Sequence, residues 1–433
     1  MAFETTTDFP VAPANHGLGA KSSLRIGILS YRSDPRVGGQ GVYLDYLSRA
    51  LIEAGHRVRV LSGPPYPLLD PKVKITELPS LDLYSKPHNG HFALRPHHLL
   101  SPIDSYEYFG HLSGKFVEPY TFGERAKSFL LRNKGEFDVL LDNQTLASGI
   151  LEASRAIGVP LVTMVHHPIT EDRRLAYNAA TNWKQRWMVR RWYAFYRMQV
   201  RVARQLEHLV TPSKSSKNHI IQEFGLDENP ISVIPLGVDR SAFQPDPKVK
   251  RASKRIVTTA SADVPLKGLR FLIDAYATLL KQHPDLILRV IGKLRDGPTQ
   301  DRIEALGLEN RIEFRSGLTR AELAREFQSA TLLVSPSLYE GFGLPAAEAM
   351  ACGTPVIVTD GGALPEVAGD AGIIVPKGDA SALARAVHDL LEDPAKWKSA
   401  AKRCQERADL RFDWGKIAPR YVELFETAIE QAC

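Results

Sequence analysis

Several features that define common protein classes are missing from this chain of 433 residues. Its three cysteines, Cys352, Cys404 and Cys433, have no paired spacing, which argues against a disulfide framework or a structural zinc site. No stretch approaches 18 apolar residues, so the sequence predicts no membrane-spanning helix. No Asp-x-Asp pair, Walker loop or Ser/His/Asp set stands out. We therefore expect no metal, no cofactor and a reducing, cytoplasmic environment.

The overall composition is that of a soluble globular protein, with 44% hydrophobic and 24% charged residues. The length is enough for two domains with separate cores. Residues 1–23 contain no apolar segment, and we expect a flexible tail there rather than a signal peptide. The net charge of +6 is unevenly spread, since Arg173 to Leu206 contains nine Lys or Arg residues and no Asp or Glu. That excess suits nucleic acid, an anionic membrane or an anionic substrate.

Short apolar runs alternate with helix-compatible segments along the whole chain. This alternation predicts an α/β protein with parallel sheets and helices on both faces. The predicted strands are 24–30, 57–62, 137–142, 161–165, 208–211, 231–234, 255–259, 286–291, 311–314, 331–335, 355–359 and 372–375. A polar, Pro-rich linker at 236–250 divides them into two doubly wound domains, and residues 66–120 show little periodicity. In such sheets, ligands bind beyond the carboxyl ends of the strands.

The most informative motif lies after the strand at 331–335. Glu340 and Glu348 stand eight positions apart across a Gly-Phe-Gly-Leu-Pro turn, and Pro345 suits the first turn of a helix. The order strand, glycine loop, helix leaves backbone N–H groups at a helix N-terminus, which favours an anion. One carboxylate can meet the charged end of a ligand, while the other holds a hydroxyl group further in.

This Glu-x7-Glu motif resembles that of the family 4 retaining glycosyltransferases, which have the GT-B fold, and the resemblance covers nearly the whole chain. It implies two doubly wound Rossmann-like domains that face each other across a cleft. It assigns 24–240 to an acceptor-side domain and 241–410 to a nucleotide-sugar domain. It also implies that the final helix, in 411–433, crosses back onto the first domain. In the family, the first Glu faces the donor sugar and the second holds the donor ribose.

The resemblance extends to further positions at the ends of strands. Lys267, before Gly268 at a helix start, matches a cation that holds the donor diphosphate. The family has an Arg five or six residues earlier, where this chain has Ala262 and Ser261, so one phosphate cation is missing and Ser261 could donate one hydrogen bond instead. His166 matches the imidazole that approaches the donor sugar, and histidine can hold a hydroxyl near neutral pH.

Backbone loops complete the expected donor site. The run Gly38-Gly39-Gln40-Gly41 opens the first helix but lacks the third glycine of a dinucleotide fingerprint, because position 44 is Leu. The resemblance places Gly39 close to the donor phosphate and Leu318 beside the nucleotide base. The expected site residues are Glu340 and His166 for catalysis, and Lys267, Glu348, Gly341, Phe342, Gly343, Leu344, Ser261, Leu318 and Gly39 for donor binding.

The basic stretch suggests where an acceptor comes from. Trp and Tyr beside Arg suit the headgroup level of a bilayer, although a helix docked on its own domain with a solvated basic face would look similar. The residues expected at the acceptor or membrane are Trp183, Arg186, Trp187, Arg190, Arg191, Trp192 and Arg197. Nucleic acid is a weaker alternative, because the remainder of the chain resembles a sugar transferase.

These observations predict a retaining hexosyltransferase that uses a nucleotide-sugar, in particular a UDP-sugar, and an acceptor hydroxyl. We expect a membrane lipid such as diacylglycerol as acceptor, with the enzyme peripheral on the inner face of the cell membrane. The alternatives are a soluble sugar or polysaccharide precursor as acceptor, and a non-catalytic subunit of the same fold that binds a partner. The missing Arg favours the last of these, and hydrolysis of the donor would separate it from an enzyme.

Overall fold

The computed structural model describes residues 23–34, 39–84, 96–260 and 264–432. The described chain divides into two compact units. The N-terminal unit contains residues 23–212, Ser216–Ile234 and the chain from Ala418 onward, and the C-terminal unit contains Ser213–Ser215 and Pro235–Ile417. The boundary near the end of the chain therefore falls inside a single helix, α16 (Trp414–Ala432).

The N-terminal unit is built on a seven-stranded parallel sheet with the order β3-β2-β1-β4-β5-β6-β7. Its central strand β4 is buried along its whole length, as expected for a parallel sheet that is covered on both faces. The strands are β1 (Arg25–Ser30), β2 (Arg57–Ser62), β3 (Lys74–Glu77), β4 (Val139–Asn143), β5 (Leu161–Met164), β6 (His208–Thr211) and β7 (Ile231–Val233).

The C-terminal unit has a six-stranded parallel sheet with the order β10-β9-β8-β11-β12-β13. The strands are β8 (Arg255–Thr259), β9 (Ile287–Ile291), β10 (Ile312–Arg315), β11 (Leu332–Ser335), β12 (Val356–Thr359) and β13 (Ile373–Val375). In both sheets the strand order reverses beside the first strand, between β1 and β4 and between β8 and β11. At such a switch point, the loops that follow the two neighbouring strands lead to opposite faces of the sheet. The space between these loops, beyond the carboxyl ends of the strands, is where ligands bind in open α/β sheets.

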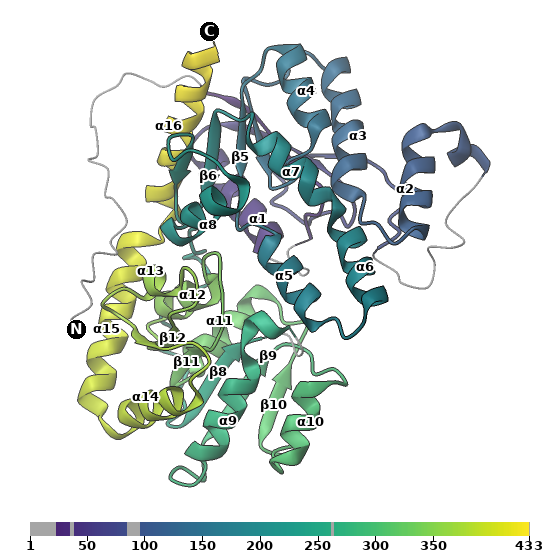
Figure 1. The fold of residues 1–433 in the computed structure, drawn as a ribbon. Helices are drawn as coiled ribbons and strands as arrows, with labels where there is room; N and C mark the ends of the chain where they lie inside the picture. Colours follow the sequence, from purple (N-terminus) through teal and green to yellow (C-terminus); the bar gives the residue numbers. More distant parts are fainter. Residues whose placement is uncertain (1–22, 35–38, 85–95, 261–263, 433) are drawn as a thin grey trace. The chain divides into compact units, whose positions relative to one another are not determined.

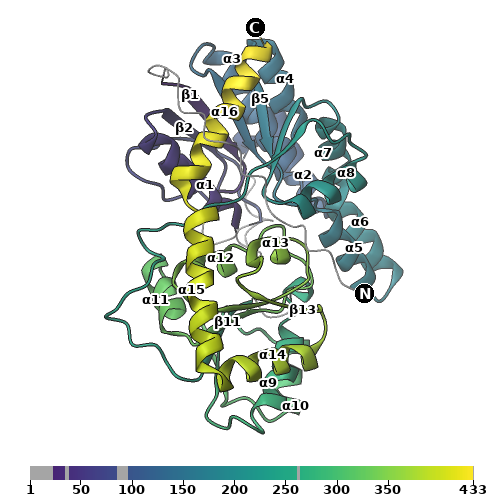
Figure 2. The same cartoon turned by 90° about the vertical axis from the view of Figure 1, so that its left-hand side faces the viewer.

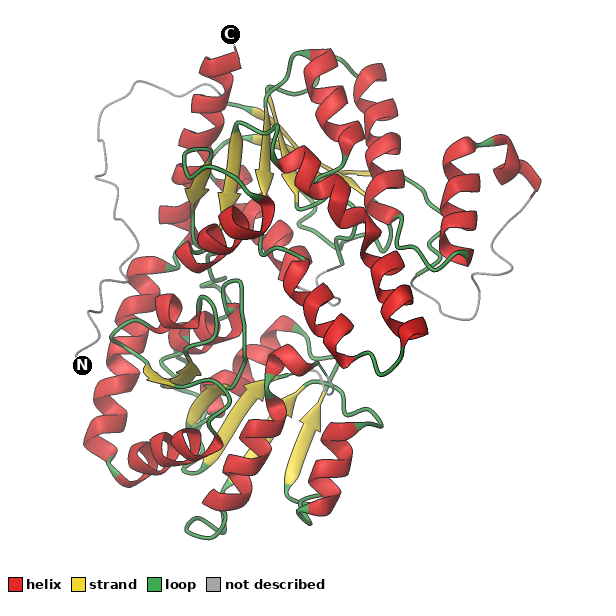
Figure 3. Ribbon diagram, viewed as in Figure 1, coloured by secondary structure: helices red, strands yellow, loops and turns green. Residues whose placement is uncertain are grey.

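Helices lie on both faces of each sheet (Figures 1 and 3). The α-helices of the described chain are α1 (Gly39–Glu53), α2 (Pro102–Leu112), α3 (Glu118–Arg132), α4 (Ser148–Ile157), α5 (Thr170–Ala179), α6 (Trp183–Trp192), α7 (Tyr196–Ala203), α8 (Lys214–Phe224), α9 (Leu269–Leu279), α10 (Pro298–Ala305), α11 (Arg320–Ser329), α12 (Leu344–Ala351), α13 (Leu364–Ala368), α14 (Ala380–Glu392), α15 (Pro394–Arg411) and α16. In the C-terminal unit, α9 and α14 pack side by side (Figure 2).

The predicted α/β class and parallel sheets are confirmed, and every predicted strand has a counterpart within two residues at either end. The exception is a strand that the sequence did not predict. β3 contains no buried residue because it lies at the sheet edge, so its side chains carry no apolar alternation. It lies in the aperiodic segment 66–120, which also contains α2 and the short 3-10 helix η2 (Pro96–Leu100).

The length and the apolar character of the helices bear on whether any of them could cross a membrane. Among the described residues, no helix combines the length and the apolar character that crossing a bilayer requires. The N-terminal tail expected at 1–23 falls, up to residue 22, outside the described residues.

Candidate functional site

The loop between β11 and α12 has the predicted form. Gly343 caps α12 with a φ of 98°, a left-handed conformation that glycine adopts without strain, and a proline follows in the first turn. The backbone of Leu344 thus starts a helix at the carboxyl end of a strand, so that the first N–H groups of α12 point toward this edge of the sheet. Glu340 precedes this helix, and Glu348 is its fifth residue.

Glu340 is held by two side chains within the C-terminal unit. Lys267 Nζ and the Ser337 hydroxyl each donate to Oε1 of Glu340 at 2.7 Å. The lysine and glutamate side chains are 34% and 17% exposed, so the ion pair is within reach of a ligand from solution. Lys267 ends the short 3-10 helix η4 (Pro265–Lys267) after β8, and Glu340 follows β11. The pair therefore lies at the switch point of this sheet.

Glycine turns bring the backbones of this site together. Gly268 has a φ of 60°, and a Cβ there would collide with the carbonyl oxygen of Pro336, in the loop that leads to Glu340. Gly362 has a φ of 65°, and a Cβ there would collide with the carbonyl oxygen of Glu340 itself. Glu340 O also accepts a hydrogen bond from Ala363 N at 2.9 Å. Three chain segments thus approach so closely that only glycine fits at the contact points.

The other residues that were predicted to bind the donor differ in their exposure and in the groups that they could present to a ligand. Glu348 is 4% exposed and lies one turn into α12. Phe342 is also 4% exposed and packs edge-on against Phe412 at 5.7 Å, so its ring belongs to the core and is not available to a ligand. Leu318 is half-buried just before Thr319, the N-cap of α11. Ser261, like Ala262, lies outside the described residues.

His166 lies in the N-terminal unit, two residues after β5, and its ring contacts are specific. Its Nε2 lies 2.9 Å from Oδ1 of Asn143. The Asn143 amide group is oriented because its Nδ2 donates to the carbonyl oxygen of Gln40, which can only accept. Nε2 of His166 must therefore carry the proton, which leaves Nδ1 as the bare nitrogen and a hydrogen-bond acceptor.

Burial keeps this imidazole neutral. His166 is 7% exposed, and desolvation, with a smaller contribution from His167, lowers its pKa to about 3. Tyr43 packs edge-on against the ring at 4.8 Å, and the Tyr43 hydroxyl is 3.2 Å from that of Tyr421 in α16. At neutral pH, His166 can accept a hydrogen bond or donate one, but it is not a cation.

Gln144 fixes the backbone on which His166 stands. Its Oε1 accepts a hydrogen bond from His166 N at 2.6 Å, and its Nε2 donates to His167 O at 3.0 Å. Gln144 has a φ of 60°, which is unusual for a residue with a side chain and costs of order 1 kcal/mol. The strained conformation occurs at a residue whose side-chain amide makes hydrogen bonds through both its oxygen and its nitrogen.

Sequence reasoning missed Asn143, Gln144, Tyr43 and Ser337. A usable signal was present, because Asn143 and Gln144 are polar residues at the carboxyl end of a buried strand, the same rule that located His166. The contact of Tyr43 with Tyr421 could not be found this way, because 378 positions separate the two residues. Gly39 is the first residue of α1, as the glycine run predicted, and it is exposed, whereas Gly38 lies outside the described residues.

Comparison with known proteins decides the family. The family model for Glycosyltransferase Family 4 matches residues 37–242, and that for Glycosyl transferases group 1 matches residues 241–411. An MMP alpha-(1->4)-mannosyltransferase from Mycolicibacterium hassiacum is 44% identical over 411 residues, which cover 94% of this chain and 98% of the relative. The chain belongs to the family 4 glycosyltransferases. A D-inositol 3-phosphate glycosyltransferase from Paenarthrobacter aurescens is 31% identical over 68% of this chain and 74% of its own length.

Solved structures agree with this glycosyltransferase in fold. Sucrose-phosphate synthase from Thermosynechococcus elongatus has a TM-score of 0.70 and 22% identity over 94% of this chain and 99% of its own. Anabaena HepE, solved with UDP and glucose, has a TM-score of 0.68 and 20% identity over 93% of this chain and 100% of its own. The predicted GT-B class of two Rossmann-like domains is confirmed.

The basic stretch of this glycosyltransferase forms α5, α6 and α7 in the N-terminal unit. None of the residues of α6 is buried, and Trp183 and Trp187 are 73% and 52% exposed. The helix is therefore not an ordinary amphipathic helix with one face in the core. It is attached at its end, where the Trp192 ring stacks on Phe116 at 5.3 Å and the Arg191 Nε donates to Ser113 O at 2.6 Å.

The basic side chains of this region are partly engaged with aromatic rings. The guanidinium groups of Arg186 and Arg190 lie 5.6 Å and 5.2 Å from the centre of the Tyr177 ring. Arg191 lies 4.6 Å from the Trp187 ring, and Arg197 is exposed. A cavity of about 290 Å³ lies among α5, α6, α7 and α8. Its lining includes Arg173, Arg174, Arg190, Tyr177 and Tyr196.

Proposed function

We propose that this glycosyltransferase transfers a hexose from a nucleotide-sugar to an acceptor hydroxyl and retains the anomeric configuration of the donor. The observation that carries the proposal is the ion pair of Lys267 with Glu340 at the N-terminal end of α12, on the switch point of its sheet. A cation, a carboxylate and the backbone N–H groups of Gly343 and Leu344 at one end of the sheet suit a ligand that has a diphosphate next to a sugar.

The diphosphate is the leaving group, and its charge grows as the glycosidic bond breaks. Lys267 and the N–H groups of Gly343 and Leu344 are donors that are already in place, and such fixed donors stabilise developing negative charge without reorganisation. In this proposal Lys267 exchanges part of its contact with Glu340 for the phosphate. Glu340 then accepts from hydroxyl groups of the donor sugar and lies near the positive charge that develops on the ring.

His166 acts as a neutral residue in this proposal. Since its Nε2 donates to Asn143, its bare Nδ1 is the atom available to accept a hydrogen bond from a sugar hydroxyl. A pKa of about 3 makes it a poor general acid at neutral pH, so its contribution is to orient the sugar. Glu348 would bind the donor ribose, and the backbone of Gly341 to Leu344 would contact the phosphates.

For the acceptor, we favour a sugar hydroxyl and a mannosyl group as the unit transferred. The support is the mannosyltransferase from M. hassiacum, whose identity of 44% extends over 98% of its length. The UDP-sugar expected from the sequence is supported only by the UDP and glucose bound in HepE, at 20% identity. The nucleotide is therefore the part of the proposal that an assay has to decide first.

The test is a matrix of purified protein against UDP-linked and GDP-linked hexoses, with mannosides and with diacylglycerol vesicles as acceptors. Release of nucleoside diphosphate should require one nucleotide-sugar and should increase when the right acceptor is added. If no nucleotide-sugar is turned over or hydrolysed with any acceptor, while the protein is folded, the alternative of a non-catalytic partner-binding subunit replaces the enzyme.

A lipid acceptor is the second candidate, and the observation in its favour is α6. This helix has no buried residue, carries Trp183 and Trp187 on its exposed surface and has no acidic residue. Exposed Trp and Arg suit the interface of an anionic bilayer, where each basic residue contributes about 1 kcal/mol. The enzyme would then be peripheral on the cytoplasmic face of the cell membrane.

Co-sedimentation with vesicles distinguishes the two acceptors. The lipid candidate requires that the protein pellets with anionic but not neutral vesicles, and that high salt releases it. Replacing exposed Arg186, Arg190 and Arg197 with Glu should also release it. Equal recovery with both kinds of vesicle, or with neither, removes this candidate and leaves the sugar acceptor.

A further inference from the structure

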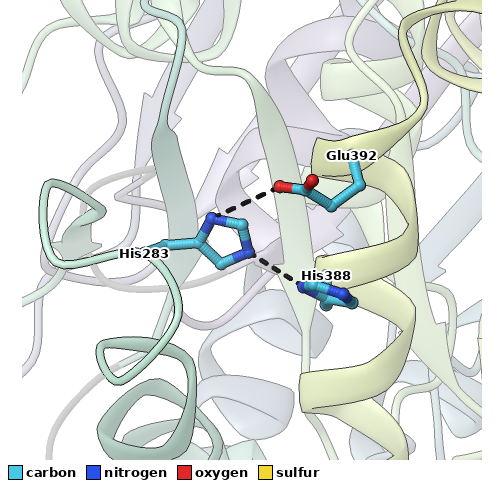
Figure 4. A group of neighbouring side chains, drawn as sticks. All are labelled: His283, His388 and Glu392. Carbon is cyan, nitrogen blue, oxygen red and sulfur yellow. Dashed lines mark hydrogen bonds and ion pairs between the residues drawn. The ribbon is translucent and has the colours of Figure 1, made fainter.

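Two histidines and a glutamate meet in the C-terminal unit, away from the donor loops. His283 lies in the turn after α9, and His388 and Glu392 lie four residues apart on α14, so that they share one face of that helix. The His283 ring points between the other two side chains (Figure 4). Its Nε2 is 3.0 Å from Nδ1 of His388, and its Nδ1 is 3.7 Å from Oε1 of Glu392.

The three side chains are close enough to share an ion. One ligand atom from each residue can be chosen so that all three lie within 4.8 Å of one another. Two imidazole nitrogens bound to the same tetrahedral zinc ion at 2.0–2.1 Å would be about 3.3 Å apart. The observed 3.0 Å between Nε2 of His283 and Nδ1 of His388 is close to that spacing. The Glu392 carboxylate faces the other nitrogen of His283, Nδ1, so the exposed Glu392 side chain has to turn toward Nε2 to complete the site.

The surroundings of His283 suit a metal ligand. The His283 side chain is 3% exposed, and a neutral imidazole offers a lone pair to a metal. Lys254 is paired with Asp285 at 2.8 Å, which reduces the repulsion that its charge would exert on a cation.

The position and the exposure of the three side chains indicate how an ion would reach them and which parts of the fold it would connect. Glu392 is 60% exposed, so the site opens to solvent on its side. His283 N donates to Leu279 O at 2.8 Å, and Leu286 N donates to His283 O at 3.0 Å, so the histidine is fixed between α9 and β9. This is the amino end of β9, whereas Lys267 and Glu340 follow the carboxyl ends of their strands.

We propose that His283, His388 and Glu392 form a binding site for a divalent transition metal, with zinc as the best match. Two imidazoles and one carboxylate are a ligand set that zinc accepts, with a fourth position left for water. The ion fastens the turn after α9 to the end of α14 and takes no part in sugar transfer. No metal-ligand spacing is visible in the sequence, because 105 positions separate the two histidines.

The experiment is a zinc titration of the full chain after treatment with EDTA and dialysis, followed by calorimetry and by thermal unfolding. The account predicts one zinc ion per chain and a higher melting temperature with zinc than without. Substitution of cobalt should give the visible absorption of a tetrahedral ion. Donor turnover should be the same with and without zinc, because the cluster lies at the amino ends of the strands and Glu340 lies beyond their carboxyl ends.

Variants on α14 locate the ion. His388→Ala should lose the bound zinc and the gain in melting temperature, and Glu392→Gln should weaken binding about tenfold or more. Asp389→Asn changes an exposed acid on the same helix that lies outside the cluster, and it should bind zinc like the wild type. If the wild type binds no zinc, or if His388→Ala binds it as tightly, the proposal is wrong and the two histidines form only a hydrogen-bonded pair.

Discussion

The two units of this glycosyltransferase position their key side chains in contrasting ways. In the N-terminal unit, His166 is buried and neutral, and it is held by the side chains of Asn143, Gln144 and Tyr43. In the C-terminal unit, Glu340 is partly exposed and paired with Lys267, and glycine turns rather than side chains bring the backbones together. One unit presents a fixed, uncharged group, and the other presents charges on a loop.

The contrast indicates a division of labour in sugar transfer. The charges that develop during the reaction, on the departing diphosphate and on the sugar ring, need charged or strongly polar partners. In the proposed mechanism, Lys267 and Glu340 are these partners. His166, with its pKa lowered by burial, can orient a hydroxyl group without introducing a charge of its own. Five substitutions test this division, from the largest expected effect to the smallest, at Glu340, Glu348, Lys267, Asn143 and Tyr421.

Glu340→Gln removes the carboxylate but keeps the shape of the side chain. We expect kcat to fall by about 100-fold or more, because the group that lies near the developing charge is lost. Glu348→Gln should instead raise the KM for the donor, in line with the loss of about 1.5–3 kcal/mol from a charge-assisted hydrogen bond. Steady-state kinetics with saturating acceptor separate the two. Wild-type turnover by both variants would contradict the site assignment.

Lys267→Ala removes the positive charge that forms an ion pair with Glu340. Ser261 and Ala262 stand where the resemblance leads us to expect a second phosphate-binding cation, an Arg. Lys267 should therefore carry more of the diphosphate charge, and the rate of transfer should fall by about 100-fold at saturating donor. Lys281→Ala, an exposed lysine in the turn after α9, is the control and should behave like the wild type. A Lys267→Ala protein that is folded and keeps most of its activity would show that the diphosphate is held elsewhere.

Asn143→Asp tests the neutrality of His166. A carboxylate 2.9 Å from Nε2 would favour the imidazolium and raise the pKa of His166. In the variant, His166 should become charged as the pH falls from 8 to 5, and the ratio of variant to wild-type kcat should fall with it, by about tenfold. In the wild type, His166 does not titrate in this range, since its pKa is about 3.

The control for this substitution is Asn218→Asp, which changes an exposed asparagine on α8. Its kcat should follow that of the wild type at each pH. A variant-to-wild-type ratio for Asn143→Asp that does not change with pH would mean that the charge state of His166 is irrelevant to transfer.

Much of this site could be predicted from sequence because its parts are local. A strand followed by a glycine turn and a helix encodes the position of Glu340, and the same rule applies to Lys267 before Gly268. The packing of Tyr43 against His166 could not be predicted, because Tyr43 comes from a distant segment of the chain whose contact leaves no local signal. The edge strand β3 was missed for a similar reason, since without a buried face it leaves no periodic signal.

Tyr421→Phe tests the most distant link to His166. It removes the hydroxyl contact of 3.2 Å between Tyr421 and Tyr43 while keeping both rings. We expect the free energy of unfolding to fall by about 1 kcal/mol, and kcat to change by less than about threefold. Urea unfolding gives the first quantity. A loss of activity as large as that of Asn143→Asp would mean that α16 controls the position of His166 more tightly than the ring contacts suggest.

The central claim, a retaining sugar transfer that depends on Glu340 and Lys267, is tested most directly by proton NMR of the product. The reaction should be followed from its start with the nucleotide-hexose that the assay matrix selects. The account predicts that the first product signal shows the same anomeric configuration as the donor, and that Glu340→Gln forms it far more slowly. A first product of opposite configuration would contradict the account.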